Sequence, residues 1–140
     1  MNRERTWEEC RETNAAVNVS PDKAKIKSLL DTAMGRNRFL NGNAIMEDNA
    51  NYIFEGLYAS LAEMLHVLVL KHGYQVGDHI CLGYYLRDVL KKEDLFRLFD
   101  DCRIKRNGLV YYGRKMHFET AKESIVKCKR LMEEIEKLVR

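Results

Sequence analysis

Apolar residues recur at steps of three and four along most of the chain, which is the spacing of one helix face. The longest such run lies between residues 43 and 72, where the apolar stripe widens toward its C-terminal end. This pattern predicts a long central helix, and the widened stripe favours contact with a second subunit. Gly56 within this run costs about 1 kcal/mol relative to alanine, which the close approach of a neighbouring helix would explain.

Several other segments show the same spacing. Ser20 precedes Pro21, which predicts a helix capped by Ser20 that runs to Gly35 or raggedly to Leu40. No segment alternates long enough to predict a strand. The expected elements are a helical turn or two packed through Trp7, the helix after Ser20, the central helix ended by Gly73, a helix opened by Asp78, a short helix from about Leu95, and a last helix from about His117 to Arg140. We therefore expect one all-α domain over residues 1–140, an antiparallel up-down bundle of four or five helices.

Composition fits a globular domain. The 140 residues suffice for a core, and 46% hydrophobic with 32% charged residues excludes a disordered chain. The net charge of +3 does not mark a nucleic-acid-binding protein by itself. The N-terminus is charged and the longest uncharged apolar run, Met64 to Leu70, is too short to cross a bilayer. We expect no signal peptide, no membrane association and a cytoplasmic protein.

The four cysteines lie far apart, without a Cys-x-x-Cys pair or a neighbouring histidine at metal-ligand spacing. This spacing argues against a zinc site and against a disulfide framework. We therefore expect four reduced thiols, no metal and no cofactor. The cysteines are Cys10, Cys81, Cys102 and Cys128.

One stretch, residues 103 to 118, differs from the rest because it contains six basic residues or histidines and no acidic residue. We expect its helix to break near Asn107-Gly108 or at Gly113, which would make it a connection between helices, where functional residues often lie. A solvated helix end is the alternative, since the helix dipole favours cations there. The stretch contains Arg103, Lys105, Arg106, Tyr111, Tyr112, Arg114, Lys115 and His117.

Arg106-Asn107 is followed by Val110-Tyr111-Tyr112-Gly113 and then by the long C-terminal helix. In an all-α chain of this length, that pattern resembles the HEPN family (higher eukaryotes and prokaryotes nucleotide-binding domains). The resemblance covers the chain from about residue 20 to its end, and family members are small helical bundles, commonly dimers. Many carry an arginine, a polar residue that is often asparagine, and a histidine four to six positions after the arginine. Arg106 and Asn107 match, Tyr111 occupies the histidine position, and His117 lies too far along.

Active members of the family resemble metal-independent ribonucleases in which the arginine and histidine of two protomers meet across the dimer interface. Histidine moves protons near neutral pH and arginine stabilises phosphate charge. Tyrosine, with an ordinary pKa of about 10, is a poor base at pH 7. The resemblance therefore implies a homodimer that binds nucleotide or RNA phosphate through the Arg106 region, with weakened or absent ribonuclease activity. It implies catalytic positions at Arg106, Asn107 and Tyr111, and binding positions at Arg103, Lys105, Tyr112, Arg114, Lys115 and His117.

The family also implies a nucleotidyltransferase-like partner protein in a toxin-antitoxin pair. The alternative is a non-catalytic helical module for protein-protein interaction. The two hypotheses make different predictions for Arg106. A HEPN-like site should have Arg106 facing an open groove near Tyr111, whereas an interaction module should have it bound to Asp100 or Asp101. Among the remaining polar residues, we expect His66 to be a partly buried helix residue and His79 a surface residue, while Arg36 and Arg38 would extend the basic surface if they lie near Arg106.

Overall fold

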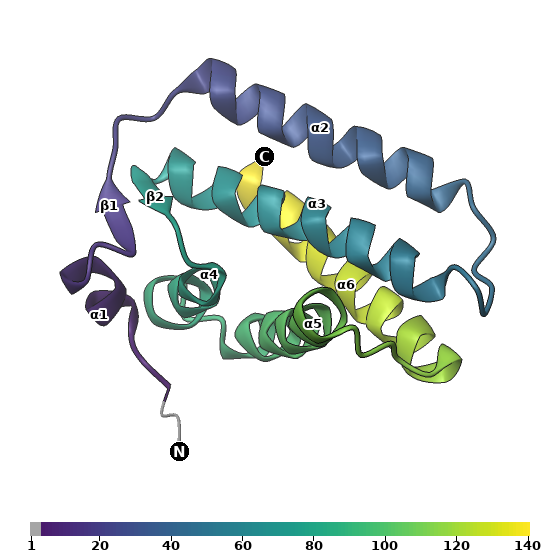
Figure 1. The fold of residues 1–140 in the computed structure, drawn as a ribbon. Coiled ribbons are helices and arrows are strands. Elements are labelled where there is room, and N and C mark those ends of the chain that lie inside the picture. The colour runs from purple at the N-terminus through teal and green to yellow at the C-terminus, as the bar shows by residue number, and fades with distance from the viewer. Residues whose placement is uncertain (1–3) are drawn as a thin grey trace.

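The computed structural model describes residues 4–140, which form six α-helices, one π-helical turn and one small sheet (Figure 1). The predicted all-α class is confirmed at this level. The elements in order are α1 (Trp7–Glu12), β1 (Ala16–Asn18), α2 (Lys23–Asn41), α3 (Ala50–Lys71), β2 (Tyr74–Val76), α4 (His79–Tyr84), the π-helical turn η1 (Tyr85–Val89), α5 (Glu93–Tyr112) and α6 (Phe118–Val139).

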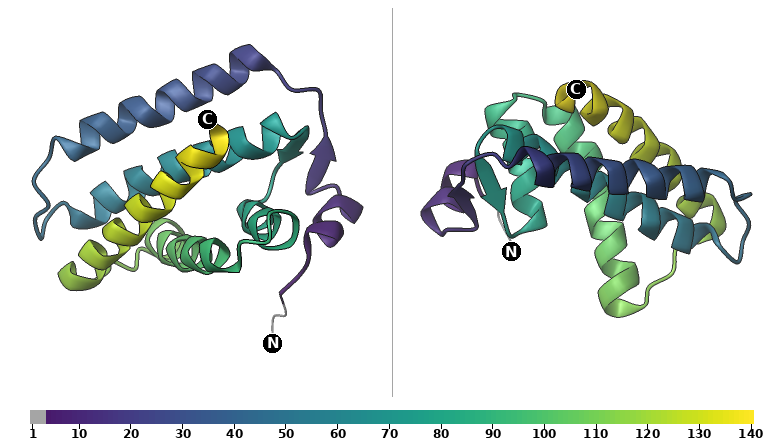
Figure 2. Two further views of the ribbon diagram at one scale, coloured as in Figure 1. Left: turned by 180° about the vertical axis from the view of Figure 1, so that it is seen from behind. Right: turned by 90° about the horizontal axis from the view of Figure 1, so that it is seen from above.

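The helices do not follow a simple up-down order. In Figure 1, α2 and α3 lie side by side and run in opposite directions, whereas α6 crosses α3 obliquely in the same general direction as α3. Helices α4 and α5 are seen end-on in that view, and the view from above in Figure 2 shows α5 crossing α3 steeply. The up-down arrangement expected from the sequence is therefore not what surrounds α3.

Helix α3 is the centre of the fold, with its most extensive contacts to α2 and α6. It is buried on nearly every face, including the widened end at Val67 to Leu70. Because the chain itself covers that end, the widened stripe is no argument for a second subunit. By length and composition α3 could also cross a membrane, but 72% of its most apolar window is buried inside the protein.

Gly56 lies where α2 approaches α3 closely. A Cβ atom built on Gly56 would lie 2.7 Å from Cδ1 of Leu40, which confirms the close approach of a neighbouring helix. Two helix starts differ from the prediction. Asp22, not Ser20, caps α2, since its Oδ1 accepts a hydrogen bond from the Lys25 backbone at 3.1 Å. Helix α3 begins at Ala50 instead of residue 43, because Asn49 bonds backwards to the backbone of Met46 and Ala44.

Two features link the N-terminal segment to β2 and α4, and sequence reasoning missed both. β1 and β2 pair antiparallel, with Ala16 opposite Val76. Cys10 of α1 and Cys81 of α4 form a disulfide, while Cys102 and Cys128 are free and buried. The prediction of four reduced thiols is therefore wrong for Cys10 and Cys81, which are 71 residues apart in sequence but adjacent in the fold.

Candidate functional site

Helix α5 carries most of the basic stretch, so that stretch is not the open connection expected from the sequence. The helix continues through Asn107 and Gly108 and ends where Gly113 adopts a left-handed conformation, with φ of 62°. The predicted break at Gly113 is correct and the alternative at Gly108 is not. Arg103 and Arg106 follow the buried Phe99 at helical steps, so they lie on the face of α5 that points toward the rest of the protein.

Arg106 is held by aromatic and amide groups. Its Nη1 donates hydrogen bonds to Oδ1 of Asn107 at 3.2 Å and to the hydroxyl of Tyr111 at 3.3 Å. The guanidinium carbon lies 5.4 Å from the ring centre of Tyr58 and 5.4 Å from that of Tyr111, within cation–π range. Within residues 4–140, Arg106 forms no ion pair with a carboxylate.

The two nearby aspartates that could have neutralised Arg106 bind other cations. Asp100 pairs with Arg103 at 2.9 Å, and Asp101 pairs with Lys105 at 2.9 Å and with Lys127 at 3.2 Å. Neither aspartate therefore neutralises the positive charge of Arg106.

Arg106 faces a surface pocket of about 310 Å³ between the C-terminal half of α5 and the start of α4. A second pocket, of about 280 Å³, lies between α3 and α5 and shares Arg106 and His79 with the first. The first is lined by Gly77, Asp78, His79, Ile80, Arg103, Arg106, Asn107 and Tyr111, and the second by Glu55, Tyr58, Ala59, Ala62, Glu63, His66, His79, Arg106 and Val110.

Two of the carboxylates beside Arg106 are themselves paired. Asp78, in the first pocket, binds Arg5 at 3.1 Å. Glu63, in the second pocket, receives two hydrogen bonds from Arg36, at 2.9 and 3.1 Å. Arg36 is thus neutralised and does not extend the basic surface toward Arg106. The first pocket keeps a net positive character, because its other arginine and its aspartate both have partners.

Sequence reasoning missed Tyr58 and His79, which line the site from α3 and α4. His79 is half-buried, and its Nδ1 lies 3.1 Å from the hydroxyl of Tyr58. Burial lowers the pKa of His79, the positive charges of Arg106 and Arg103 lower it further, and Asp78 opposes them. His79 is therefore a neutral imidazole at pH 7, although it was expected to be an ordinary surface residue.

His66 lies beside His79, with ring centres 5.8 Å apart. Burial, followed by the neighbouring His79, lowers the pKa of His66 to about 4. Burial also raises the pKa of Tyr58 well above its ordinary value, so Tyr58 remains a neutral phenol that can donate or accept a hydrogen bond. The predicted partial burial of His66 is confirmed.

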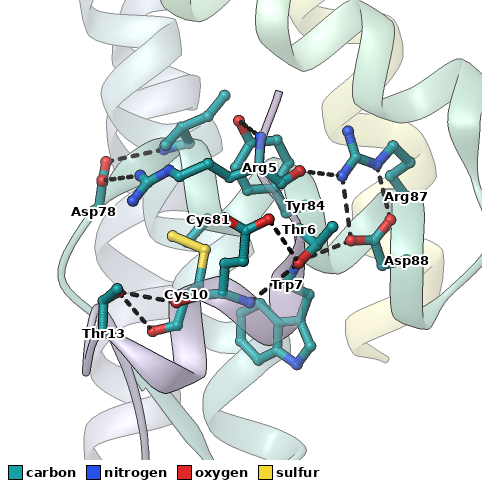
Figure 3. The surroundings of a disulfide bond; sticks show 12 residues. Arg5, Thr6, Trp7, Cys10, Thr13, Asp78, Cys81, Tyr84, Arg87 and Asp88 are labelled. Carbon is teal, nitrogen blue, oxygen red and sulfur yellow. Dashed lines mark hydrogen bonds and ion pairs between the residues drawn. A yellow bond between two sulfur atoms is a disulfide. The ribbon is translucent and has the colours of Figure 1, made fainter. Parts of the chain in front are cut away.

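The N-terminal segment fixes the start of α4, the helix that begins with His79. Figure 3 shows the contacts of this segment with Asp78 and Cys81. Asp78 caps α4 by accepting a hydrogen bond from the Ile80 backbone at 3.3 Å, and Arg5 binds the other oxygen of Asp78. The Cys10–Cys81 disulfide joins α1 to α4 two residues beyond His79. These links between distant parts of the chain leave His79 little freedom to move away from Arg106.

The predicted site residues fall into two groups. Arg106, Asn107, Tyr111 and Arg103 line one pocket, although Arg103 is also bound to Asp100. The others do not line it. Lys105 is bound to Asp101, and His117 is exposed just before α6. The guanidinium carbon of Arg114 lies 5.0 Å from the ring centre of Tyr112, and Nζ of Lys115 lies 5.8 Å from that of Tyr52. The structure thus retains the three predicted catalytic positions as neighbours and separates most of the predicted binding positions from them.

Comparisons with protein-family models, curated proteins and solved structures found no match to this chain. The resemblance to the HEPN family therefore stays a prediction. Within residues 4–140, no three histidine, cysteine, aspartate or glutamate side chains are grouped so that they could hold a metal ion.

Proposed function

We propose that this protein binds the phosphate of a nucleotide or RNA strand at Arg106, as a HEPN-like dimer with weakened or absent metal-independent ribonuclease activity. The observation that carries the proposal is that Arg106 lines an open pocket with no carboxylate partner in the described chain. A guanidinium offers several N–H donors in a fork that matches two phosphate oxygens, and Arg106 uses only Nη1 for hydrogen bonds to the protein.

Two neighbours can complete a phosphate site. Oδ1 of Asn107 accepts from Arg106, which leaves the Asn107 amide nitrogen to donate. The hydroxyl of Tyr111 accepts from the same guanidinium and can turn its proton toward a ligand oxygen. Tyr111 therefore suits an orienting donor, as expected for a tyrosine at the motif histidine position.

Exposed aromatic rings favour RNA as the ligand. Tyr111, which lines the pocket, is 65% exposed, and the following residue, Tyr112, is 70% exposed. Unstacked bases of single-stranded RNA bind to such rings, at about 1–3 kcal/mol per base. The same exposed rings also favour the alternative function, a non-catalytic module that binds a partner protein through the end of α5.

RNA binding tests the proposal directly. We would titrate a labelled single-stranded RNA with the wild-type protein, with Arg106→Ala and with Arg114→Ala, in the presence of a chelator. Arg114→Ala is the control, because it removes an equal charge from the same stretch but outside the pocket. A lost charged hydrogen bond of about 1.5–3 kcal/mol predicts roughly 10- to 150-fold weaker binding for Arg106→Ala. Loss of one phosphate contact should also reduce the slope of log K against log salt concentration by about 0.7.

Equal losses in the two variants would contradict a specific site at Arg106 and leave general electrostatic attraction. Absence of RNA binding by the wild-type protein would favour the interaction module, whose partner would then be sought by pull-down. The proposed homodimer and the proposed nucleotidyltransferase-like partner are tested separately, by sedimentation of the purified protein and by co-purification.

A further inference from the structure

His79 lines the same pocket as Arg106, although it lies 27 positions before it in sequence. It begins α4, and its ring lies between α3 and α5, at 5.9 Å from the ring of Tyr58. His79 and Arg106 line both of the pockets at this site. A ligand in either pocket can therefore contact both Arg106 and His79.

The two ring nitrogens of His79 have different environments. Nδ1 is hydrogen-bonded to the hydroxyl of Tyr58 at 3.1 Å, which fixes the plane of the ring. Nε2 has no hydrogen-bond partner within residues 4–140, so it is the nitrogen left for a ligand. When Nδ1–H donates to Tyr58, Nε2 carries the lone pair and can accept a proton.

Tyr58 serves both groups at once. Its ring face lies under Arg106, with 5.4 Å between the guanidinium carbon and the ring centre, and its hydroxyl bonds to His79. Tyr58 is only 1% exposed and packs against Phe99 of α5, so it is a rigid support. A buried side chain thus positions a cation and an imidazole together, and such fixed positions of catalytic groups favour proton transfer at a phosphate ester.

The charged groups around His79 favour a neutral ring. Arg103 and Arg106 face it from α5, His66 faces it from α3, and Asp78 precedes it. Burial and the two arginines lower the pKa of His79 more than Asp78 raises it. A neutral imidazole is the form that removes a proton from a hydroxyl group.

We propose that His79 is the proton acceptor of the site and takes the place of the histidine that the motif lacks at Tyr111. This inference rests on the proposed function, because the substrate is the RNA strand bound at Arg106. Nε2 of His79 removes the proton of a ribose 2′-OH, and the 2′-oxygen attacks the adjacent phosphorus while Arg106 stabilises the added negative charge.

The P–O5′ bond then breaks, and the 5′-oxygen leaves with the bonding electron pair and takes a proton from water. The hydroxide formed takes the proton from His79, which restores both the imidazole and the water. The products are a 2′,3′-cyclic phosphate and a 5′-hydroxyl end, and no oxidant, reductant or metal is consumed.

The test measures binding and cleavage of the same RNA, in chelator, by the wild-type protein, His79→Gln and Arg106→Ala. His117→Ala is the matched control, since it removes an exposed histidine outside the pocket. Loss of general base catalysis predicts a 10²- to 10⁴-fold slower cleavage for His79→Gln, with RNA affinity within threefold of wild type and with 2′,3′-cyclic phosphate as the wild-type product. A DNA of the same sequence should bind and remain uncleaved, because it lacks the 2′-OH.

Wild-type binding without cleavage, or equal cleavage by wild type and His79→Gln, would overturn the role of His79 and leave the phosphate site intact. Wild-type protein that does not bind RNA would instead overturn the proposed function and this inference together. If His79→Gln does not fold, the pH dependence of wild-type cleavage decides: the rate should rise with pH through a pKa below 6.5 and then level off. A rate that keeps rising to pH 9 would contradict histidine as the base.

Discussion

The hydroxyl of Tyr58 lies 3.1 Å from Nδ1 of His79, which joins the central helix to the first residue of α4 inside the candidate site. Removal of this hydrogen bond distinguishes a role of the hydroxyl in positioning His79 from a role in RNA binding. Tyr58→Phe keeps the ring under Arg106 but removes the hydroxyl, so RNA affinity should change by less than about threefold.

Cleavage by Tyr58→Phe should fall about tenfold or more, since the His79 ring is no longer held, and the free energy of unfolding should fall by about 1 kcal/mol for the lost hydrogen bond. Binding titrations, product analysis and denaturant unfolding check these three values. A Tyr58→Phe protein that binds RNA as weakly as Arg106→Ala would show that the hydroxyl serves binding instead.

His66 should make the stability of the protein depend on pH. Its pKa of about 4 in the folded state lies below the ordinary value of 6.5, mainly because of burial and then because of His79. Protonation of His66 therefore favours the unfolded chain. The contribution of His66 to the free energy of unfolding is complete above pH 6.5 and is lost as pH falls toward 4, by roughly 3 kcal/mol over the whole interval.

Urea unfolding of the wild-type protein and of His66→Gln between pH 4 and pH 7 measures this contribution. The difference in stability between the two proteins should shrink as pH falls. A difference that stays constant with pH would mean that His66 titrates near its ordinary value.

The disulfide predicts a defined thiol count. Protein purified without reductant and then denatured should show two reactive thiols, Cys102 and Cys128, and four after reduction. Four thiols before reduction would support the original expectation from the sequence.

Removal of the disulfide should also lower stability. The bond closes a loop with a sequence separation of 71, for which chain entropy gives about 4 kcal/mol. The double variant Cys10→Ser with Cys81→Ser should therefore unfold at lower denaturant concentration than the oxidised wild-type protein. Reductant should lower the stability of the wild-type protein, which contains the disulfide, but not that of the double variant.

Local patterns in the sequence were sufficient for much of the fold. The stripe from Phe118 onward predicted α6, Gly113 was one of the two predicted ends of α5, and Gly56 predicted the approach of another helix, which is supplied by Leu40. The first two features depend on residues close together in the chain, where helical spacing and glycine conformation decide the structure. The third was indicated by one glycine, and its contact comes from the preceding helix α2.

The features that the sequence did not reveal depend on residues far apart in the chain. Tyr58, His79 and Arg106 meet only because α4 and α5 cross α3, and no motif spacing connects them. The strands have three residues each, too few for an alternating pattern, and the disulfide joins positions 71 residues apart. The motif alone therefore gave Arg106, Asn107 and Tyr111 but not the histidine that completes their pocket.

The most direct test of the central claim is to map where RNA contacts the protein. We would titrate isotopically labelled protein with a 2′-O-methyl RNA, which cannot be cleaved, and follow amide and arginine side-chain resonances by NMR. The account predicts the largest shifts at residues 77–80, at Asn107 and Tyr111 and at the side chain of Arg106, all lost in Arg106→Ala. Shifts confined to residues 114–117, or no shifts at all, would contradict a phosphate site at Arg106.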